Sequence, residues 1–389
     1  DDDDISAVVD ILKSDWLTSG PAGFKFENEF SKKTGSRYSV SCCNATAALH
    51  LATLAIGLGP KNRVIIPAIT FAATANAVRY AGAEVIFCDV EKDTGLISLE
   101  HAELILKNEA ESISAIFPVH LNGQSPDLEY ISYLAEKYDL FIVEDACHAI
   151  GGSYIKKNGQ KSTIGNCEFS DMTVFSFHPV KTITSGEGGI INTNNEKIYN
   201  KLSRMRSHGI TKNESEFENK ENAYSNNGIL NPWYYEQIEL GFNYKLSDIN
   251  CALATSQLKK IDKFSESRKR LSQLYDGLLE SLKPNIIPVR RNKHSEPCWH
   301  IYPVLIDYEK IKIERFALMN KLKKKGIITQ VHYIPIYKHP YYKKILGNIA
   351  LPNSEYYYDH VLTLPLFPLM SEDDVQYIVD ELRNLVINY

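Results

Sequence analysis

The chain has 389 residues, of which 44% are hydrophobic and 23% are charged, and its formal net charge is −5. A chain of this length can bury a large core and favours two domains over one or three. The lack of a basic excess argues against nucleic acid as a partner, and no apolar run has the length of a membrane span, so no membrane association is expected.

The N-terminus and the cysteines indicate the compartment. Asp1-Asp-Asp-Asp-Ile5 is not a signal peptide, and because no Met stands first, we expect native residues before Asp1. The seven cysteines include no Cys-x-x-Cys pair. Neither zinc nor a disulfide framework is therefore favoured, no metal site is expected, and the reducing cytoplasm fits the chain.

Two helices are predicted at the start of the chain. Residues 5–13 and 24–34 carry apolar side chains at helical spacing. For the second helix, the candidates for burial in the core are Phe24, Phe26 and Phe30.

A strand at 38–42 runs directly into a predicted helix at 43–55, which Asn44 or Thr46 could cap. Such a junction exposes free N–H groups at the positive end of the helix dipole, which suits an anion. An ordinary helix cap explains the same residues at least as well.

From residue 38 to residue 200, apolar runs alternate with helical stretches such as 128–137. The predicted strands are 38–42, 64–66, 84–89, 114–120, 140–145, 172–177 and 189–192. This alternation predicts an α/β fold, a mostly parallel central sheet with helices on both faces. Ligands of such sheets bind beyond the carboxyl ends of the strands. The residues at these ends, which could face one crevice, are Asn44–Thr46, Phe71, Asp145 and Ser176–Lys181.

The second half of the chain reads differently. Residues 208–236 are polar and rich in turns, which predicts a long surface excursion, and 246–282 is helical and charged. The strands expected after that bridge are 300–306, 327–333 and 361–364, with helices at 312–325 and 371–386. We therefore predict a large α/β domain over 1–245 and, over 246–389, a bridging helix with a smaller C-terminal α+β domain.

One lysine stands on a constrained turn within Phe175-Ser-Phe-His-Pro-Val-Lys-Thr-Ile-Thr-Ser-Gly-Glu-Gly-Gly189. Pro179 removes a backbone donor and fixes φ, so a regular strand cannot continue to Lys181. A lone lysine in such a place is more often a solvated loop residue. The glycines that follow do not form a phosphate loop, because no Gly-Lys-Ser/Thr comes after them.

A pyridoxal 5'-phosphate (PLP) enzyme needs a lysine for the Schiff base, a carboxylate at the pyridine nitrogen, a phosphate site and a group against the ring. The residues that could meet these needs are Lys181, Asp145, Ala45, Thr46, Ser176, Phe71 and His148.

Each of these residues also has an ordinary explanation. Asp145 could cap a helix, His148 and Phe71 could belong to the core, and Ser176 could merely fill space. Spacing alone does not identify the cofactor.

The segment around Lys181 strongly resembles the active-site signature of the DegT/DnrJ/EryC1/StrS family of nucleotide-sugar aminotransferases, which are fold-type I PLP enzymes. Four further segments match in the family's order and cover nearly the whole chain: Asn44–Leu49, Pro67–Asn76, Glu144–Ala149 and Gly241–Asp248. Related dehydratases carry His at the lysine position, so Lys181 favours transamination.

The resemblance implies a role for each matched residue. Lys181 would bind PLP covalently, with pyridoxamine phosphate (PMP) as the intermediate, Asp145 would pair with the pyridine nitrogen, and His148 would lie near the ring. The family's phosphate and stacking contacts fall on Ala45, Thr46, Ser176 and Phe71. Asn243 would reach the phosphate in a neighbouring subunit, which implies a homodimer with shared active sites.

Three other segments, Pro118–Gln124, Trp233–Ile238 and Gln330–Tyr337, resemble the branch that makes UDP-4-amino-4,6-dideoxy-N-acetyl-β-L-altrosamine for pseudaminic acid. That branch moves the amino group of L-glutamate to C4 of a UDP-linked 4-keto-6-deoxy-N-acetyl-L-hexosamine. The candidates for substrate contact are Lys245, His332 and Tyr333; surface charge and core packing explain them equally well. The alternatives are an aminotransferase for another UDP-, dTDP- or GDP-linked keto sugar and, more remotely, a non-catalytic PLP-binding regulator or a scaffold without cofactor.

Overall fold

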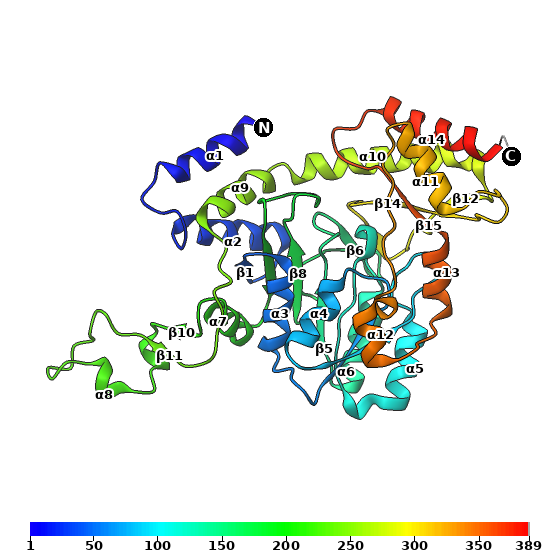
Figure 1. Ribbon diagram of the computed structural model, residues 1–389. Helices are drawn as coiled ribbons and strands as arrows, with labels where there is room; N and C mark the ends of the chain where they lie inside the picture. The colour runs from blue at the N-terminus through cyan, green and yellow to red at the C-terminus, as the bar shows by residue number, and fades with distance from the viewer. Residues whose placement is uncertain (388–389) are drawn as a thin grey trace.

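A seven-stranded sheet forms the centre of this computed structural model, which describes residues 1–387 (Figure 1). Across the sheet the strands are β1 (Tyr38–Cys42), β9 (Gly189–Thr193), β8 (Met172–Ser176), β5 (Phe141–Asp145), β4 (Ile113–Ile116), β2 (Arg63–Pro67) and β3 (Glu84–Cys88). From β8 to β3 all neighbours are parallel, whereas β9 is antiparallel to both β1 and β8. The expected mostly parallel sheet is confirmed.

Helices cover both faces of this sheet, as predicted. On one face lie α3 (Ala45–Ala55), α4 (Ala72–Tyr80) and α7 (Glu196–Met205). On the other lie α2 (Pro21–Thr34), α5 (Leu99–Glu109), α6 (Leu128–Tyr138) and α9 (Asp248–Leu258). The period of two explains this: Val64 and Ile66 pack toward α3 and α4, and Ile65 packs toward α5 and α6. The first helix, α1 (Asp2–Leu12), packs on α9.

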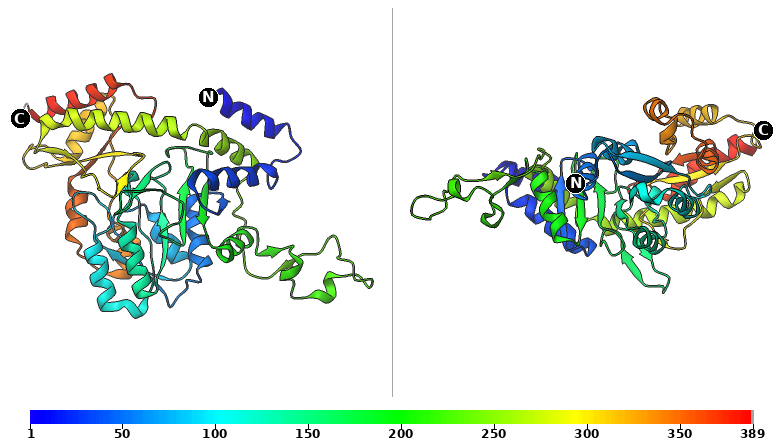
Figure 2. Two further views of the ribbon diagram at one scale, coloured as in Figure 1. Left: turned by 180° about the vertical axis from the view of Figure 1, so that it is seen from behind. Right: turned by 90° about the horizontal axis from the view of Figure 1, so that it is seen from below.

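Residues 208–236 leave the body of the molecule as a projecting excursion, as predicted (Figures 1 and 2). It contains β10 (Ile210–Thr211), α8 (Lys220–Ala223) and β11 (Glu236–Gln237). A separate small sheet consists of β13 (Ser295–Glu296), β6 (Ser153–Ile155) and β7 (Lys161–Thr163). The short 3-10 helices are Ala110–Ser112, Leu121–Gly123, Glu214–Glu216, Glu280–Leu282 and Ile336–Lys338.

The C-terminal part has its own sheet and apolar cluster. The long helix α10 (Ile261–Leu279) runs from α9 toward it (Figure 2). The sheet is β12 (Ile286–Pro288), β14 (Tyr302–Ile306) and β15 (Val361–Leu364), and the helices are α11 (Arg315–Lys324), α12 (Pro340–Leu346), α13 (Pro352–His360) and α14 (Glu372–Ile387). The apolar side chains of α10, α11, α14 and this sheet form one cluster. The division into 1–245 and 246–389 stays a prediction.

Two sequence predictions were wrong. Phe24 is 70% exposed, whereas Phe26 and Phe30 are fully buried. Positions two apart on a helix lie about 200° apart, so Phe24 and Phe26 cannot share one buried face. Residues 327–333 do not form a strand. Gln330 pairs with Thr363 in an isolated bridge, and the chain then leaves the sheet.

One strand boundary differs from the prediction, and one of the two predicted helix caps is confirmed. The strand expected at 114–120 ends at Ile116, since Pro118 cannot donate a backbone hydrogen bond. Asn44, not Thr46, caps α3, and its side chain accepts from the Ala47 N–H. Across residues 1–387, no helix is both long and apolar enough to cross a membrane.

Candidate active site

A cavity of about 410 Å³ opens beyond the carboxyl ends of β2, β5 and β8. Seven of the eight predicted cofactor residues line it: Ala45, Thr46, Phe71, Asp145, His148, Ser176 and Lys181. They come from four separate segments of the chain. The predicted crevice at the strand ends therefore exists, and the fold brings these side chains together there.

Lys181 follows a tight turn just after β8. Its backbone N–H donates to the His178 carbonyl at 2.8 Å, with Pro179 inside the turn. The amine is half-buried, and burial lowers its pKa below the ordinary value, while the negative charge of Asp145 opposes that shift. A lysine in this setting loses its proton more readily than one in water, which is what a nucleophilic amine requires.

Asp145 is the last residue of β5, and its carboxylate is buried at the cavity wall. One oxygen accepts from the Thr74 hydroxyl at 2.6 Å, and the other accepts from the Cys147 N–H at 3.2 Å. Residues 146–151 form turns, so Asp145 does not cap a helix. The carboxylate is therefore held in place at the cavity and forms no ion pair within residues 1–387, so it is available to a cationic nitrogen.

The start of α3 forms the end of the site that is suited to bind an anion. Ala45 and Thr46 begin this helix, where the first N–H groups have no helix carbonyl to bind, and Ser176 lies beside them. Gly189 on β9 allows the start of α3 to lie this close to the sheet, because a Cβ at position 189 would lie 2.6 Å from the Ala45 nitrogen. Helix-start N–H groups beside a hydroxyl suit a phosphate group, so these residues fit the phosphate end of PLP.

His148 and Tyr333 lie together in the wall of the cavity. The Tyr333 hydroxyl and His148 Nε2 hydrogen-bond at 3.1 Å, and the Tyr333 ring lies 6.1 Å from the ring of Phe71. Phe71 is 60% exposed, so it is a wall of the cavity and not part of the core. Burial, together with the charge of Lys181, lowers the pKa of His148 well below its usual value, which keeps the imidazole neutral.

Not all the predicted residues lie in the cavity. His332 does not line it; its Nδ1 hydrogen-bonds with the Thr363 hydroxyl at 2.9 Å, and burial followed by the charge of Lys181 lowers its pKa to about 4. Asn243 is exposed and accepts from Lys245 Nζ at 2.8 Å, and neither residue lines the cavity of its own chain.

The sequence did not indicate Thr70, Cys147 and Glu187, which belong to the cavity wall, or Thr74, which binds Asp145 directly from behind that wall. His178 falls within the predicted range Ser176–Lys181 and lines the cavity as expected. Glu187 lies within the lysine segment itself, and this neighbourhood was the available signal. In residues 1–387 no group of three His, Cys, Asp or Glu side chains is placed to hold a metal ion.

Comparison with known proteins agrees with this geometry. A model of the DegT/DnrJ/EryC1/StrS aminotransferase family matches residues 1–383. A curated relative from Campylobacter jejuni, UDP-4-amino-4,6-dideoxy-N-acetyl-beta-L-altrosamine transaminase, is 35% identical over 99% of this chain and 95% of its own length.

Two solved structures superpose on the whole chain. Helicobacter pylori PseC, an aminotransferase of pseudaminic acid biosynthesis, has a TM-score of 0.88 at 28% identity and is covered over 97% of its length. A sugar aminotransferase from Streptococcus pneumoniae in its PLP form, Spr1654, has a TM-score of 0.86 at 26% identity and is likewise covered over 97%. The fold of this chain is therefore that of fold-type I PLP aminotransferases.

Proposed function

This chain belongs to the DegT/DnrJ/EryC1/StrS family and is a PLP-dependent sugar aminotransferase, and from that premise we propose its substrate and the roles of its residues. The reaction proposed is transfer of the amino group of L-glutamate to C4 of a UDP-linked 4-keto-6-deoxy-N-acetyl-L-hexosamine. The product would be UDP-4-amino-4,6-dideoxy-N-acetyl-β-L-altrosamine. The observation that carries the roles is one cavity that joins Lys181, Asp145 and the start of α3.

Lys181 is the residue proposed to bind PLP covalently and to move protons. When bound, PLP supplies a carbonyl that condenses with amines and a ring that accepts electrons from the neighbouring carbon. Because burial lowers its pKa, the Lys181 amine gives up its proton more readily than an exposed lysine and is better suited to act as a base. It takes a proton from the α-carbon of glutamate and later delivers one to C4 of the sugar.

The other residues are proposed to hold and orient the cofactor. Asp145, fixed by Thr74, keeps a proton on the pyridine nitrogen. The Ala45 and Thr46 N–H groups and the Ser176 hydroxyl would bind the phosphate, and Phe71, which also lines the cavity, would lie against the ring. His148, held by its hydrogen bond to Tyr333, would lie near the ring hydroxyl of bound PLP.

Asn243 and Lys245 are proposed to act in the active site of a second copy of the chain. Neither residue lines the cavity of its own chain, and Asn243 is exposed. A homodimer that shares its active sites would place them there. His332 contacts the Tyr333 ring edge-on at 4.9 Å, so we propose that it supports Tyr333 at the sugar site. The cytoplasmic location stays a prediction.

Replacement of Lys181 tests the assignment of the cofactor lysine. In Lys181→Ala we expect no covalent attachment of PLP and no turnover. Borohydride reduction of the parent protein followed by peptide mass spectrometry should place the cofactor on Lys181. Lys201→Ala is the matched control, because its amine donates to the Ala55 carbonyl away from the cavity. Covalent PLP on another lysine would refute the assignment.

The choice of sugar needs a separate assay. The UDP-, dTDP- and GDP-linked 4-keto sugars, each offered with L-glutamate, should give amino-sugar product at the highest kcat/KM with the UDP-linked L-hexosamine. The alternative is an aminotransferase for another nucleotide-linked keto sugar. Failure with the UDP substrate and success with another would establish that alternative.

A further inference from the structure

We propose that His120, acting through Glu144, is a positioning residue that fixes Asp145 and the end of β8 relative to each other beneath the cavity. This inference rests on the proposed role of Asp145 at the pyridine nitrogen. Neither His120 nor Glu144 lines the cavity, so any effect on the cofactor has to pass through the residues that do.

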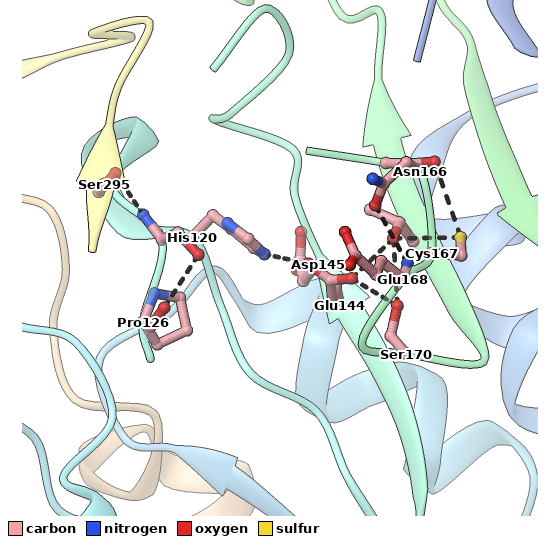
Figure 3. A network of polar contacts seen from close by, with 12 residues as sticks. His120, Pro126, Glu144, Asp145, Asn166, Cys167, Glu168, Ser170 and Ser295 are labelled. Carbon is pink, nitrogen blue, oxygen red and sulfur yellow. Dashed lines mark hydrogen bonds and ion pairs between the residues drawn. The ribbon is translucent and has the colours of Figure 1, made fainter. Parts of the chain in front are cut away.

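Glu144 is a buried carboxylate that joins three segments of the chain (Figure 3). It lies next to Asp145 on β5, and alternation along the strand turns the two side chains in opposite directions. One oxygen accepts from His120 Nε2 at 2.7 Å, and the other accepts from the hydroxyls of Ser170 and, at 2.9 Å, Thr173. Thr173 belongs to β8, the strand that ends at Ser176 and leads to Lys181.

His120 holds the end of β5 at two points. Its backbone N–H donates to the Asp145 carbonyl at 3.0 Å, and its side chain reaches the carboxylate of the preceding residue. The Asp145 N–H in turn donates to the Pro118 carbonyl at 2.9 Å. The segment 118–120 thus continues the pairing of β4 with β5 beyond Ile116, up to the residue that meets the cofactor.

Because the Glu144 carboxylate is buried, the position of the end of β5 depends on the groups that donate hydrogen bonds to it. Burial alone would raise the pKa of the carboxyl, but the hydrogen bonds from His120, Ser170 and Thr173 hold it below the ordinary value. Loss of the imidazole would leave a buried carboxylate oxygen without its donor, and the strand end would have to move to satisfy it. The exposed fraction of the His120 side chain is 0%, so water cannot take its place without a rearrangement.

The test is His120→Leu, with His120→Gln as the conservative variant, because a glutamine amide can donate to Glu144. Displacements of about 1 Å at a reacting group cost on the order of 100-fold in rate. We expect kcat to fall by about 10- to 100-fold in His120→Leu and to recover most of that loss in His120→Gln. The second readout is the ¹⁵N resonance of ring-labelled PLP in the holoenzyme, which should shift toward the unprotonated nitrogen in His120→Leu only.

Two controls separate the possible failures. His294→Leu removes a half-buried histidine near a carboxylate, Asp127 at 3.4 Å, outside the cavity, and should lower Tm without moving the ¹⁵N resonance. Asp145→Asn should move that resonance; if it does not, the proposed role of Asp145 fails. If Asp145→Asn moves it and His120→Leu changes only Tm, the positioning role of His120 is refuted. Should His120→Leu not fold, Glu144→Gln and the double variant Ser170→Ala, Thr173→Val replace it. A moved ¹⁵N resonance in these variants would support the positioning role, and a change in Tm alone would refute it.

Discussion

The Thr74 hydroxyl donates to the Asp145 carboxylate at 2.6 Å, which ties α4 to the end of β5. Both side chains are buried, and Thr74 lies in turn 2.8 Å from the Thr70 hydroxyl. A buried carboxylate needs donors to stay charged. Thr74 therefore orients Asp145 for a cationic partner on the cavity side.

Thr74→Val removes this donor and keeps the shape of the side chain. Hydrogen bonds to charged groups contribute about 1.5–3 kcal/mol, which is roughly 10- to 100-fold in an equilibrium or rate constant. We expect kcat/KM to fall within that range and the affinity for PLP to weaken, measured by steady-state kinetics and cofactor titration.

Thr70→Val is the graded control for this experiment, since Thr70 contacts Thr74 and not Asp145. Its effect should be several-fold smaller. Equal losses in the two variants would contradict a direct role of the Thr74 hydroxyl.

Gly189→Ala should disturb the phosphate end of the cavity. Gly189 pairs with Cys42 on β1 and with Ser176 on β8, and an added Cβ would lie 2.6 Å from the Ala45 backbone nitrogen. Backbone atoms cannot rotate away, so α3 has to shift. Overpacking costs about 1–3 kcal/mol, and we expect that loss in denaturant unfolding together with a higher Kd for PLP.

Gly277→Ala tests whether this loss is specific to the site. Gly277 lies within α10, and a Cβ there would meet no atom within 4 Å. Alanine in place of a helical glycine should stabilise the protein by about 0.5–1 kcal/mol and leave PLP affinity unchanged. If Gly189→Ala behaved like Gly277→Ala, the close approach of α3 would not matter for the cofactor.

The sequence located the cavity because hydrophobic alternation marks the strand ends, and Phe71, Asp145 and Ser176 all follow from that rule. It did not locate Thr74, since the hydroxyl and its carboxylate partner are 71 residues apart and nothing in the local sequence marks this threonine. Identification of the cofactor came from the resemblance of the ordered segments, because spacing alone left it open.

Other parts of the fold lay beyond a pattern argument. The antiparallel direction of β9 is one, since Ile190 and Ile191 are buried on opposite faces whichever way the strand runs. The segment 327–333 has the apolar and β-branched composition of a strand, yet it pairs only through Gln330 and then carries Tyr333 into the cavity. Tertiary contacts overrode local propensity there.

Acid should destabilise the cofactor-free protein partly through His332. Burial, followed by the charge of Lys181, lowers its pKa to about 4, compared with 6.5 in the unfolded chain. Between pH 6.5 and 4 the unfolded state binds a proton that the folded state does not, so the free energy of unfolding falls as pH is lowered. His332 accounts for up to about 3 kcal/mol of that fall.

His332→Gln should therefore flatten the dependence of unfolding free energy on pH between 6.5 and 4, measured by urea denaturation. Above pH 7 His332 is neutral in both states, so the two proteins should give parallel curves there. An identical slope for parent and variant below pH 6.5 would show that His332 takes up its proton in the folded state as readily as in the unfolded one.

Tyr333→Phe should destabilise the folded protein and slow the reaction, because the hydroxyl is the hydrogen-bond partner of His148 Nε2. The other ring nitrogen, Nδ1, is buried without a protein partner, so the variant would leave the imidazole with none. A buried polar group without its partner costs about 1–3 kcal/mol. We expect this loss in unfolding free energy and a fall in kcat, since the imidazole at the cavity wall is no longer held.

A double-mutant cycle with His148→Ala isolates the contact, and a coupling energy of about 0.5–3 kcal/mol is expected. Tyr224→Phe on the excursion is the matched control: its hydroxyl donates to Glu214 at an exposed site, where the loss should stay under about 0.5 kcal/mol. If the two Tyr333 and His148 variants were additive, the hydrogen bond between them would contribute nothing to stability, and His148 would have to be held by its packing against His300, whose ring lies 4.5 Å away.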